Sequence, residues 1–167
     1  MMMRLSDEFG FNISTFHHAL EAWKIPKQMK DRNIAIATFA DLWGYKWEAY
    51  DASVWASKIL YDAGVNLIMK SDHPVTHARF LLYEAAKAAH YGLADQAAIA
   101  SITTNPAKAA GIDSHIGMIK FNYDADIVIW AKDPLLLWAQ PDKVFIDGEL
   151  LVDNKITTIN TESHVFT

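Results

Sequence analysis

The feature that most constrains this chain is a short apolar run that ends abruptly in polar residues. Val65 to Met69 is mostly apolar and β-prone, and it follows Gly64, which suits the left-handed position after a helix. A short apolar run after a helix end is typical of a buried parallel strand. Asp72 and His73 stand just past its carboxyl end, where α/β folds carry their chemistry. The alternative is that Asp72 only caps a helix opened by Pro74.

Strand-like and helix-like segments alternate along the first 111 residues. We expect strands at 11–16, 34–39 and 65–69, and helices at 20–32 with a break at Pro26, 50–61, 77–90, 95–102 and 106–110. This alternation predicts a parallel sheet. The predicted strands are followed by His17 and His18, by Asp41, and by Asp72. Because parallel strands end at the same edge of a sheet, we expect these side chains to share one rim.

After Gly111 the pattern changes to short strands. We expect them at 127–130, 143–146 and 150–152, with Asp147-Gly148 as the turn of a hairpin. The sequence therefore predicts two units. Residues 1–111 form a strand–helix unit with the candidate metal-site strand ends, and residues 112–167 form a β-rich tail.

The composition limits which sites the chain can build. It has no cysteine, so a metal site must use His, Asp or Glu, and no disulfide framework exists. The net charge is −5 and no basic run appears, which argues against nucleic acid and acidic membranes as partners. No segment reads as a secretory signal or a bilayer span. We expect a cytoplasmic protein, with a secreted one as the alternative.

Histidine and aspartate at strand ends suit a divalent metal ion. Imidazole nitrogen and carboxylate oxygen are both good ligands for zinc and similar ions. Asp72 could bind such an ion and also take a proton from its bound water, whose pKa the ion lowers to about 7. His73 and His77 are four residues apart, but Pro74 lies between them. We do not expect that pair to form a metal site, and we interpret His77 as a solvated residue.

Several motifs occur together in the order of one known family. They are His17 to Ala22, Lys70 to Val75, the T-x-N-P-A element at Thr103 to Ala107, Asp124 to Trp130, and Val144 to Gly148. Together they resemble metal-dependent amidohydrolases, specifically the imidazolonepropionase-like branch. The resemblance implies the C-terminal part, about strands six to eight, of a TIM-type barrel with a small β-rich tail that contributes to a composite β-sandwich. Asn122 stands where the family usually has glycine, and Asn tolerates the left-handed conformation.

The resemblance also implies roles for individual residues. Asp72 matches the eighth-strand aspartate, a metal ligand and general acid/base, and His18 matches the sixth-strand metal ligand. The candidates for the substrate mouth are His17, Asp41, Trp43, Tyr45 and His73. We interpret Trp47 and Tyr50 as packing residues, and Lys46 with Glu48 as a surface pair. Lys70 receives no assignment.

The function implied is a hydrolase of non-peptide C–N bonds, in a cyclic amide or related small molecule, by metal-bound hydroxide with Asp72 as acid/base. Zinc is the expected metal, with iron or another divalent ion as alternatives. The family's ligands from the first, fourth and fifth barrel strands have no counterpart here. We therefore expect the chain to be inactive alone and to pair with the N-terminal part of a barrel or with a second copy. The alternative is a catalytically inactive remnant that acts as an oligomerising or structural domain.

Overall fold

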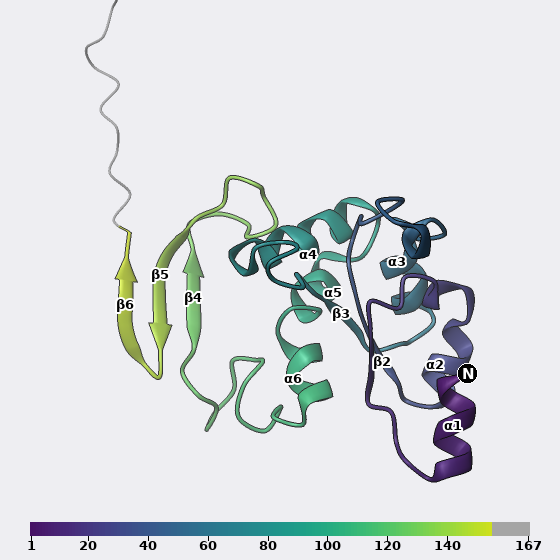
Figure 1. Cartoon of the computed structure of the whole chain (residues 1–167). Coiled ribbons are helices and arrows are strands. Elements are labelled where there is room, and N and C mark those ends of the chain that lie inside the picture. Colours follow the sequence, from purple (N-terminus) through teal and green to yellow (C-terminus); the bar gives the residue numbers. More distant parts are fainter. Residues whose placement is uncertain (155–167) are drawn as a thin grey trace, which may run out of the picture.

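Two small sheets organise the structure, a computed structural model that describes residues 1–154 (Figure 1). The first sheet holds β1 (Thr15–His17), β2 (Ala35–Thr38) and β3 (Leu67–Met69), and the second holds β4 (Ile127–Trp130), β5 (Pro141–Ile146) and β6 (Glu149–Asp153). The α-helices are α1 (Met2–Phe9), α2 (Pro26–Asp31), α3 (Ala56–Asp62), α4 (Leu81–His90), α5 (Asp95–Ala100) and α6 (Thr104–Ala110). Short 3₁₀ turns lie at Ala22–Lys24, Trp47–Ala49 and Ala78–Phe80. No helix within residues 1–154 is long and apolar enough to cross a membrane.

The first sheet is parallel, with the order β1-β2-β3, as the strand–helix alternation predicts. Ile36 of β2 pairs with Phe16 on one side and with Leu67 on the other. The first strand lies later than predicted, because it pairs with β2 only from Thr15 onward and extends to His17. The α/β class predicted from the sequence is confirmed.

The two faces of this sheet differ in what covers them. Ile36, Leu67 and Met69 belong to the main core, which also takes buried side chains from α2, α3, α4 and α5. Alternate residues point to the other face, where Ala35, Ala37 and Ile68 form a smaller cluster with Ala109 of α6. The period of two therefore separates the face that packs against α2 to α5 from the face of Ala35, Ala37 and Ile68, which packs against α6.

Three predicted helices begin at other residues. The helix predicted over 50–61 starts only at Ala56, because the Ser53 hydroxyl accepts a hydrogen bond from Trp55 N at 3.2 Å and holds a turn there. Pro74 opens no helix, since residues 71–76 form a turn closed by the bond from Thr76 N to Ser71 O. The helix predicted over 106–110 begins earlier, at Thr104, so Asn105 lies inside α6.

The second sheet is an antiparallel meander in the order β4-β5-β6. Its last hairpin turns at Asp147-Gly148, as predicted. Asn122 has φ 65°, which confirms the left-handed conformation expected before Asp124. Figure 1 shows this sheet at the opposite side of the molecule from α1. The part of the predicted tail at 155–167 lies outside the described residues.

Candidate functional site

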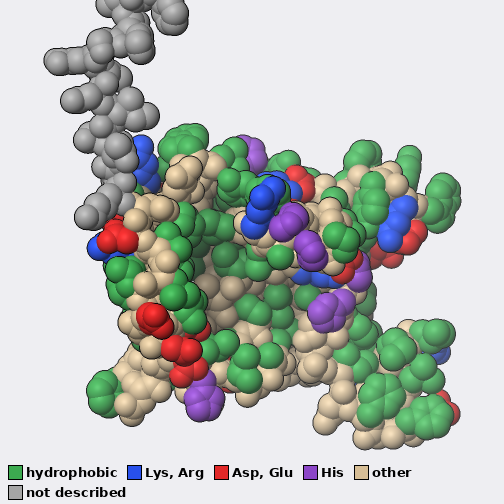
Figure 2. Space-filling view, turned by 60° about the vertical axis from the view of Figure 1, so that its left-hand side comes forward, with side chains coloured by type: hydrophobic (Ala, Val, Ile, Leu, Met, Phe, Trp, Pro, Cys, Tyr) green, Lys and Arg blue, Asp and Glu red, His purple; other side chains and the backbone are tan. Residues whose placement is uncertain are grey.

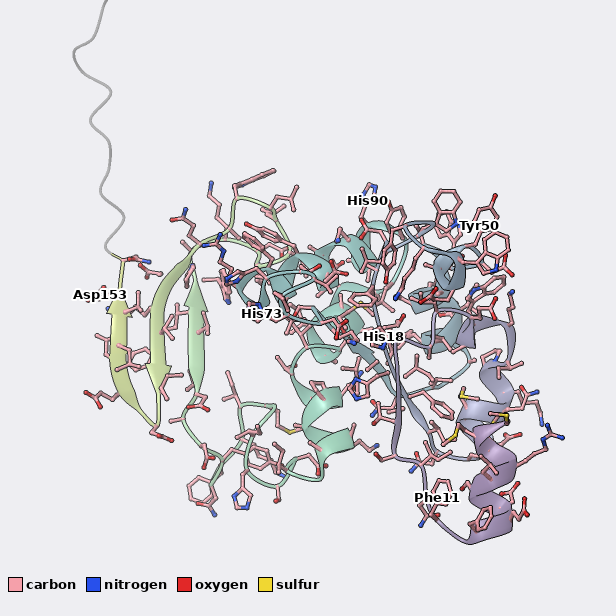
Figure 3. The ribbon with its side chains drawn as sticks, in the orientation of Figure 1. Phe11, His18, Tyr50, His73, His90 and Asp153 are labelled. Carbon is pink, nitrogen blue, oxygen red and sulfur yellow. The ribbon has the colours of Figure 1, made fainter. Side chains whose placement is uncertain are left out.

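His18 and Asp72 meet just beyond the carboxyl ends of β1 and β3. His18 Nε2 lies 2.9 Å from Asp72 Oδ2, although 54 residues separate the two in sequence. Both residues have left-handed backbones, with φ 67° for His18 and 51° for Asp72. Non-glycine residues rarely adopt that conformation, and such strain concentrates at functional sites. Figure 3 shows His18 in the central part of the molecule, with His73 nearby.

Lys70, for which the sequence predicts no role, is the third residue of this cluster. Its Nζ lies 3.1 Å from Asp72 Oδ1 and 3.2 Å from His18 Nε2, and 5.0 Å from the centre of the Phe39 ring. The alternation of β3 gives a signal for it, because Leu67 and Met69 face the helices while Ile68 and Lys70 share the other side. A single lysine at the end of an apolar strand is therefore directed toward the strand-end site.

The neighbours of Asp72 keep its carboxyl group ionised. The hydrogen bond with His18, followed by the one from Lys70, lowers the pKa of Asp72 below its ordinary value. An ionised carboxylate is the form that binds a metal ion or accepts a proton. The site is half exposed, with the Asp72 side chain 38% accessible, so water reaches it.

The chemistry of His18 and Asp72 suits a divalent ion, but their number does not complete a site. Among residues 1–154, no group of three or more His, Cys, Asp or Glu lies close enough to hold one. Catalytic zinc sites use three protein ligands. The described part of the chain therefore supplies at most two of the ligands that such a site needs.

Asp41, a predicted mouth residue, lies in an ion-pair network with α4. Lys87 Nζ is 2.6 Å from Asp41 Oδ1 and 2.5 Å from Oε1 of the buried Glu84. Glu84 Oε2 also accepts a hydrogen bond from Ala40 N at 2.9 Å. Burial alone would lower the pKa of Lys87, but the bonds to Asp41 and Glu84 outweigh it and raise that pKa. The network fixes the chain just after β2 against α4.

The aromatic residues after β2 form an exposed loop. The Trp47 ring stacks on the Tyr50 ring with centroids 6.0 Å apart, and Trp43 lies 6.3 Å from Tyr50. Trp47 is 88% exposed and Tyr50 is 63% exposed, so their interpretation as packing residues is wrong. Within this loop the Tyr50 ring lies against those of Trp43 and Trp47. Trp43 and Tyr45 are exposed as well, at 59% and 50%.

Lys46 and Glu48 form the predicted surface pair, with Nζ 3.0 Å from Oε1. An open cavity of about 900 Å³ lies beside this loop, and its lining includes His18, Met2, Trp47 and Tyr50. The candidate ligand His18 thus borders a mostly apolar hollow. Figure 2 shows hydrophobic side chains over much of one face, with histidines near its middle.

The remaining histidines of the predicted mouth do not join the cluster. His17 is exposed at the end of β1, where it pairs with Ala37, and within residues 1–154 its side chain makes no hydrogen bond to His18, Lys70 or Asp72. His73 Nδ1 accepts a hydrogen bond from Ala78 N at 3.3 Å, so the ring closes the turn after β3. The His73 and His77 rings lie edge to face with centroids 4.8 Å apart.

Comparisons with known proteins identify a family and a fold similar to this one. Residues 53–151 match the model of the amidohydrolase family. Amidohydrolase tasK of Hapsidospora irregularis is 45% identical over 159 residues, which cover 93% of this chain and 16% of tasK. The crystal structure of an amidohydrolase from Thermotoga maritima has a TM-score of 0.85 and 32% identity, covering 91% of this chain and 40% of that one.

A more distant likeness shows the fold alone. A zinc-bound adenosine deaminase from Xanthomonas campestris has a TM-score of 0.69 at 19% identity, over 92% of this chain and 40% of that one. The chain thus spans less than half the length of each of these relatives. On the family match over residues 53–151, the chain belongs to the amidohydrolase family.

Proposed function

We propose that β1, β2 and β3 correspond to strands six to eight of a TIM-type barrel, and that β4 to β6 belong to a β-sandwich beside it. The parallel order of the first three strands and the separate antiparallel sheet support this assignment. The likeness to the Thermotoga maritima amidohydrolase over 40% of its length supports it further. The boundary between the two units is placed at residue 111, after α6.

The proposed activity is metal-dependent hydrolysis of a C–N bond in a cyclic amide or related small molecule. The contact of His18 Nε2 with Asp72 Oδ2 at 2.9 Å carries this proposal, because it joins two ligand-type side chains at the ends of β1 and β3, on one edge of the sheet. A divalent ion, which we propose to be zinc, would supply a Lewis acid for the amide carbonyl and for water. The zinc in the Xanthomonas campestris deaminase supports that choice.

In this proposal Asp72 also moves the proton. Its carboxylate accepts a proton from the attacking water and returns it to the leaving nitrogen, as a general base and then a general acid. The lowered pKa keeps Asp72 ionised, which is the form that can accept this proton. The substrate mouth is assigned to His17, Asp41, Trp43, Tyr45 and His73, around the strand ends. The other metal ligands come from the remainder of a barrel or from a second copy of the chain.

A chimera tests this proposal. This chain replaces the matching 40% of the Thermotoga maritima amidohydrolase, which leaves that protein's own strands to complete the barrel. We expect the chimera to retain zinc and to hydrolyse cyclic amides from a substrate panel. Asp72→Asn in the chimera should lower turnover by a factor of about 10² to 10⁴, because the proton carrier is lost.

The matched control is Asp62→Asn, which changes a surface aspartate of α3 that pairs with Lys58. It should leave turnover unchanged, and circular dichroism should show the same fold for both variants. Near-normal turnover of a folded Asp72→Asn chimera would remove Asp72 from the mechanism.

A second candidate function is a non-catalytic domain that only associates with other chains. The observation in its favour is that residues 1–154 bring together only two candidate ligands, with the Lys70 ammonium on both of them. A folded chimera that neither retains zinc nor turns over any amide would support this candidate over the first.

A further inference from the structure

The cluster of His18, Lys70 and Asp72 already contains a cation, which belongs to the chain itself. The Lys70 ammonium contacts Asp72 Oδ1 at 3.1 Å and His18 Nε2 at 3.2 Å. The Lys70 side chain is only 11% exposed, and its Nζ lies 5.0 Å from the centre of the Phe39 ring. Packing and the hydrogen bond to Asp72 therefore hold the ammonium beside both residues that the proposed function assigns to a metal ion.

The two candidate ligands also bond directly to each other. A ring nitrogen of histidine has either a proton to donate or a lone pair to accept with, and a carboxylate can only accept. The 2.9 Å contact is therefore a hydrogen bond donated by His18 Nε2 to Asp72 Oδ2. In this arrangement Nε2 offers no lone pair to a metal ion. Because Nε2 and the Lys70 ammonium are then both donors, their 3.2 Å contact is not a hydrogen bond, and Asp72 accepts a hydrogen bond from each of them.

We infer that Lys70 is a positioning residue that holds the Asp72 carboxylate beside His18 without a metal ion, and that a divalent ion binds there only by displacing its ammonium. Zinc binds nitrogen and oxygen ligands at about 2.0–2.2 Å, so an ion between His18 and Asp72 would stand against the Lys70 ammonium. The positive charges of the zinc ion and of the Lys70 ammonium would then repel each other strongly, because water is partly excluded around the ammonium. The inference relies on the proposed function only for the identity of the two ligands.

Zinc titration of the full chain, followed by calorimetry, tests this inference. Lys70→Met removes the charge and keeps an unbranched side chain, so it should bind zinc about tenfold more tightly than the wild type, or better. Lys70→Arg keeps a cation and should bind zinc as weakly as the wild type. Lys58→Met removes a surface lysine that pairs with Asp62 on α3, and it should change nothing.

The location of the gained zinc is tested separately. The His73 and His77 rings lie 4.8 Å apart and offer another pair of nitrogens. Adding His18→Ala to Lys70→Met should therefore abolish the gain in affinity. A gain that survives His18→Ala would overturn the inference, because the zinc would then be bound elsewhere.

Three further results would contradict it: equal zinc affinity in the wild type and Lys70→Met, no detectable zinc binding by either, or a gain in Lys70→Arg as large as in Lys70→Met. Circular dichroism of each variant shows whether the fold is kept. Because calorimetry measures binding and not turnover, a failed inference about Lys70 is distinguishable from a failed proposal of hydrolysis.

Discussion

At the scale of single residues, Asn105 shows how one side chain joins a helix to the central strand. Its Nδ2 donates a hydrogen bond of 2.7 Å to the backbone oxygen of the buried Leu67. Asn66 in turn donates to the backbone oxygen of Asn105 at 3.3 Å. The T-x-N-P-A element thus holds the backbone of β3 in place, and Lys70 and Asp72 follow the carboxyl end of that strand.

Asn105→Ala should destabilise the protein by about 1 to 3 kcal/mol, because it removes a hydrogen bond to a buried carbonyl. The control is Asn12→Ala, in an exposed loop, which should change the free energy of unfolding by less than about 0.5 kcal/mol. Urea denaturation measures both. Equal stability of Asn105→Ala and wild type would show that the bond contributes nothing.

The residues of the site were predictable to different degrees. His18 and Asp72 were predictable as neighbours, because apolar runs before them indicate strands that end at one rim. The side that Lys70 faces was also predictable, from its alternation with Met69 in β3, but its contacts with both His18 and Asp72 were not. Asp41 was expected at the mouth, but its pairing with Lys87 depends on where α4 packs, which local sequence does not specify.

At the scale of elements, the sequence predicts some bounds well, such as those of β4 and the start of α5, and others poorly, such as those of β1 and the start of α3. β4 has the predicted bounds, and its apolar run begins directly after Asp126. α3 begins later than predicted, since Ser53 bonds to the backbone and competes with the helix. Helix α1 carries no clear signal and is fixed by a distant contact, the ion pair between Asp7 and Arg32.

That ion pair predicts a dependence of stability on pH. Arg32 donates to both oxygens of Asp7 at 2.7 Å, and these hydrogen bonds lower the Asp7 pKa below its ordinary 3.8. The unfolded chain then binds more protons, so the stabilisation is present above pH 3.8 and is lost as the pH falls through the folded-state pKa. Wild type should therefore be more stable than Asp7→Asn at pH 7, with the difference shrinking at pH 3. A difference in urea midpoint that stays constant with pH would contradict this.

Leu67 of β3 lies in the main core and is 1% exposed. Leu67→Ala should cost about 2 to 5 kcal/mol, because it removes buried apolar surface and leaves a cavity. Leu151→Ala, in β6 where Leu151 is 58% exposed, is the matched control and should cost less than about 0.5 kcal/mol. Thermal unfolding of both variants compares their stabilities. Similar losses of stability in the two would contradict the assignment of the core to the first sheet.

At the scale of the whole molecule, the sequence predicts the fold class and the order of motifs but not which surfaces are covered. Val128, Ile129, Leu150 and Leu151 of the second sheet are each more than 40% exposed. In the described residues β1 pairs with β2 alone, so one of its edges is free. Exposed apolar surface and free strand edges both favour association.

We therefore predict that the chain associates with itself in solution at micromolar concentration. Sedimentation velocity should show a dimer or larger species. Leu151→Lys should shift it toward the monomer, because it puts a charge on the exposed sheet. A single monomeric species with cooperative unfolding would contradict the prediction.

The central claim is that His18 and Asp72 form one half of a metal site at the ends of β1 and β3. The most direct measurement is anomalous X-ray scattering at the zinc edge from crystals of the chimera. We predict an anomalous peak about 2.0–2.2 Å from both His18 Nε2 and an Asp72 carboxylate oxygen. Zinc bound elsewhere in the chimera, with the His18–Asp72 hydrogen bond intact, would contradict it.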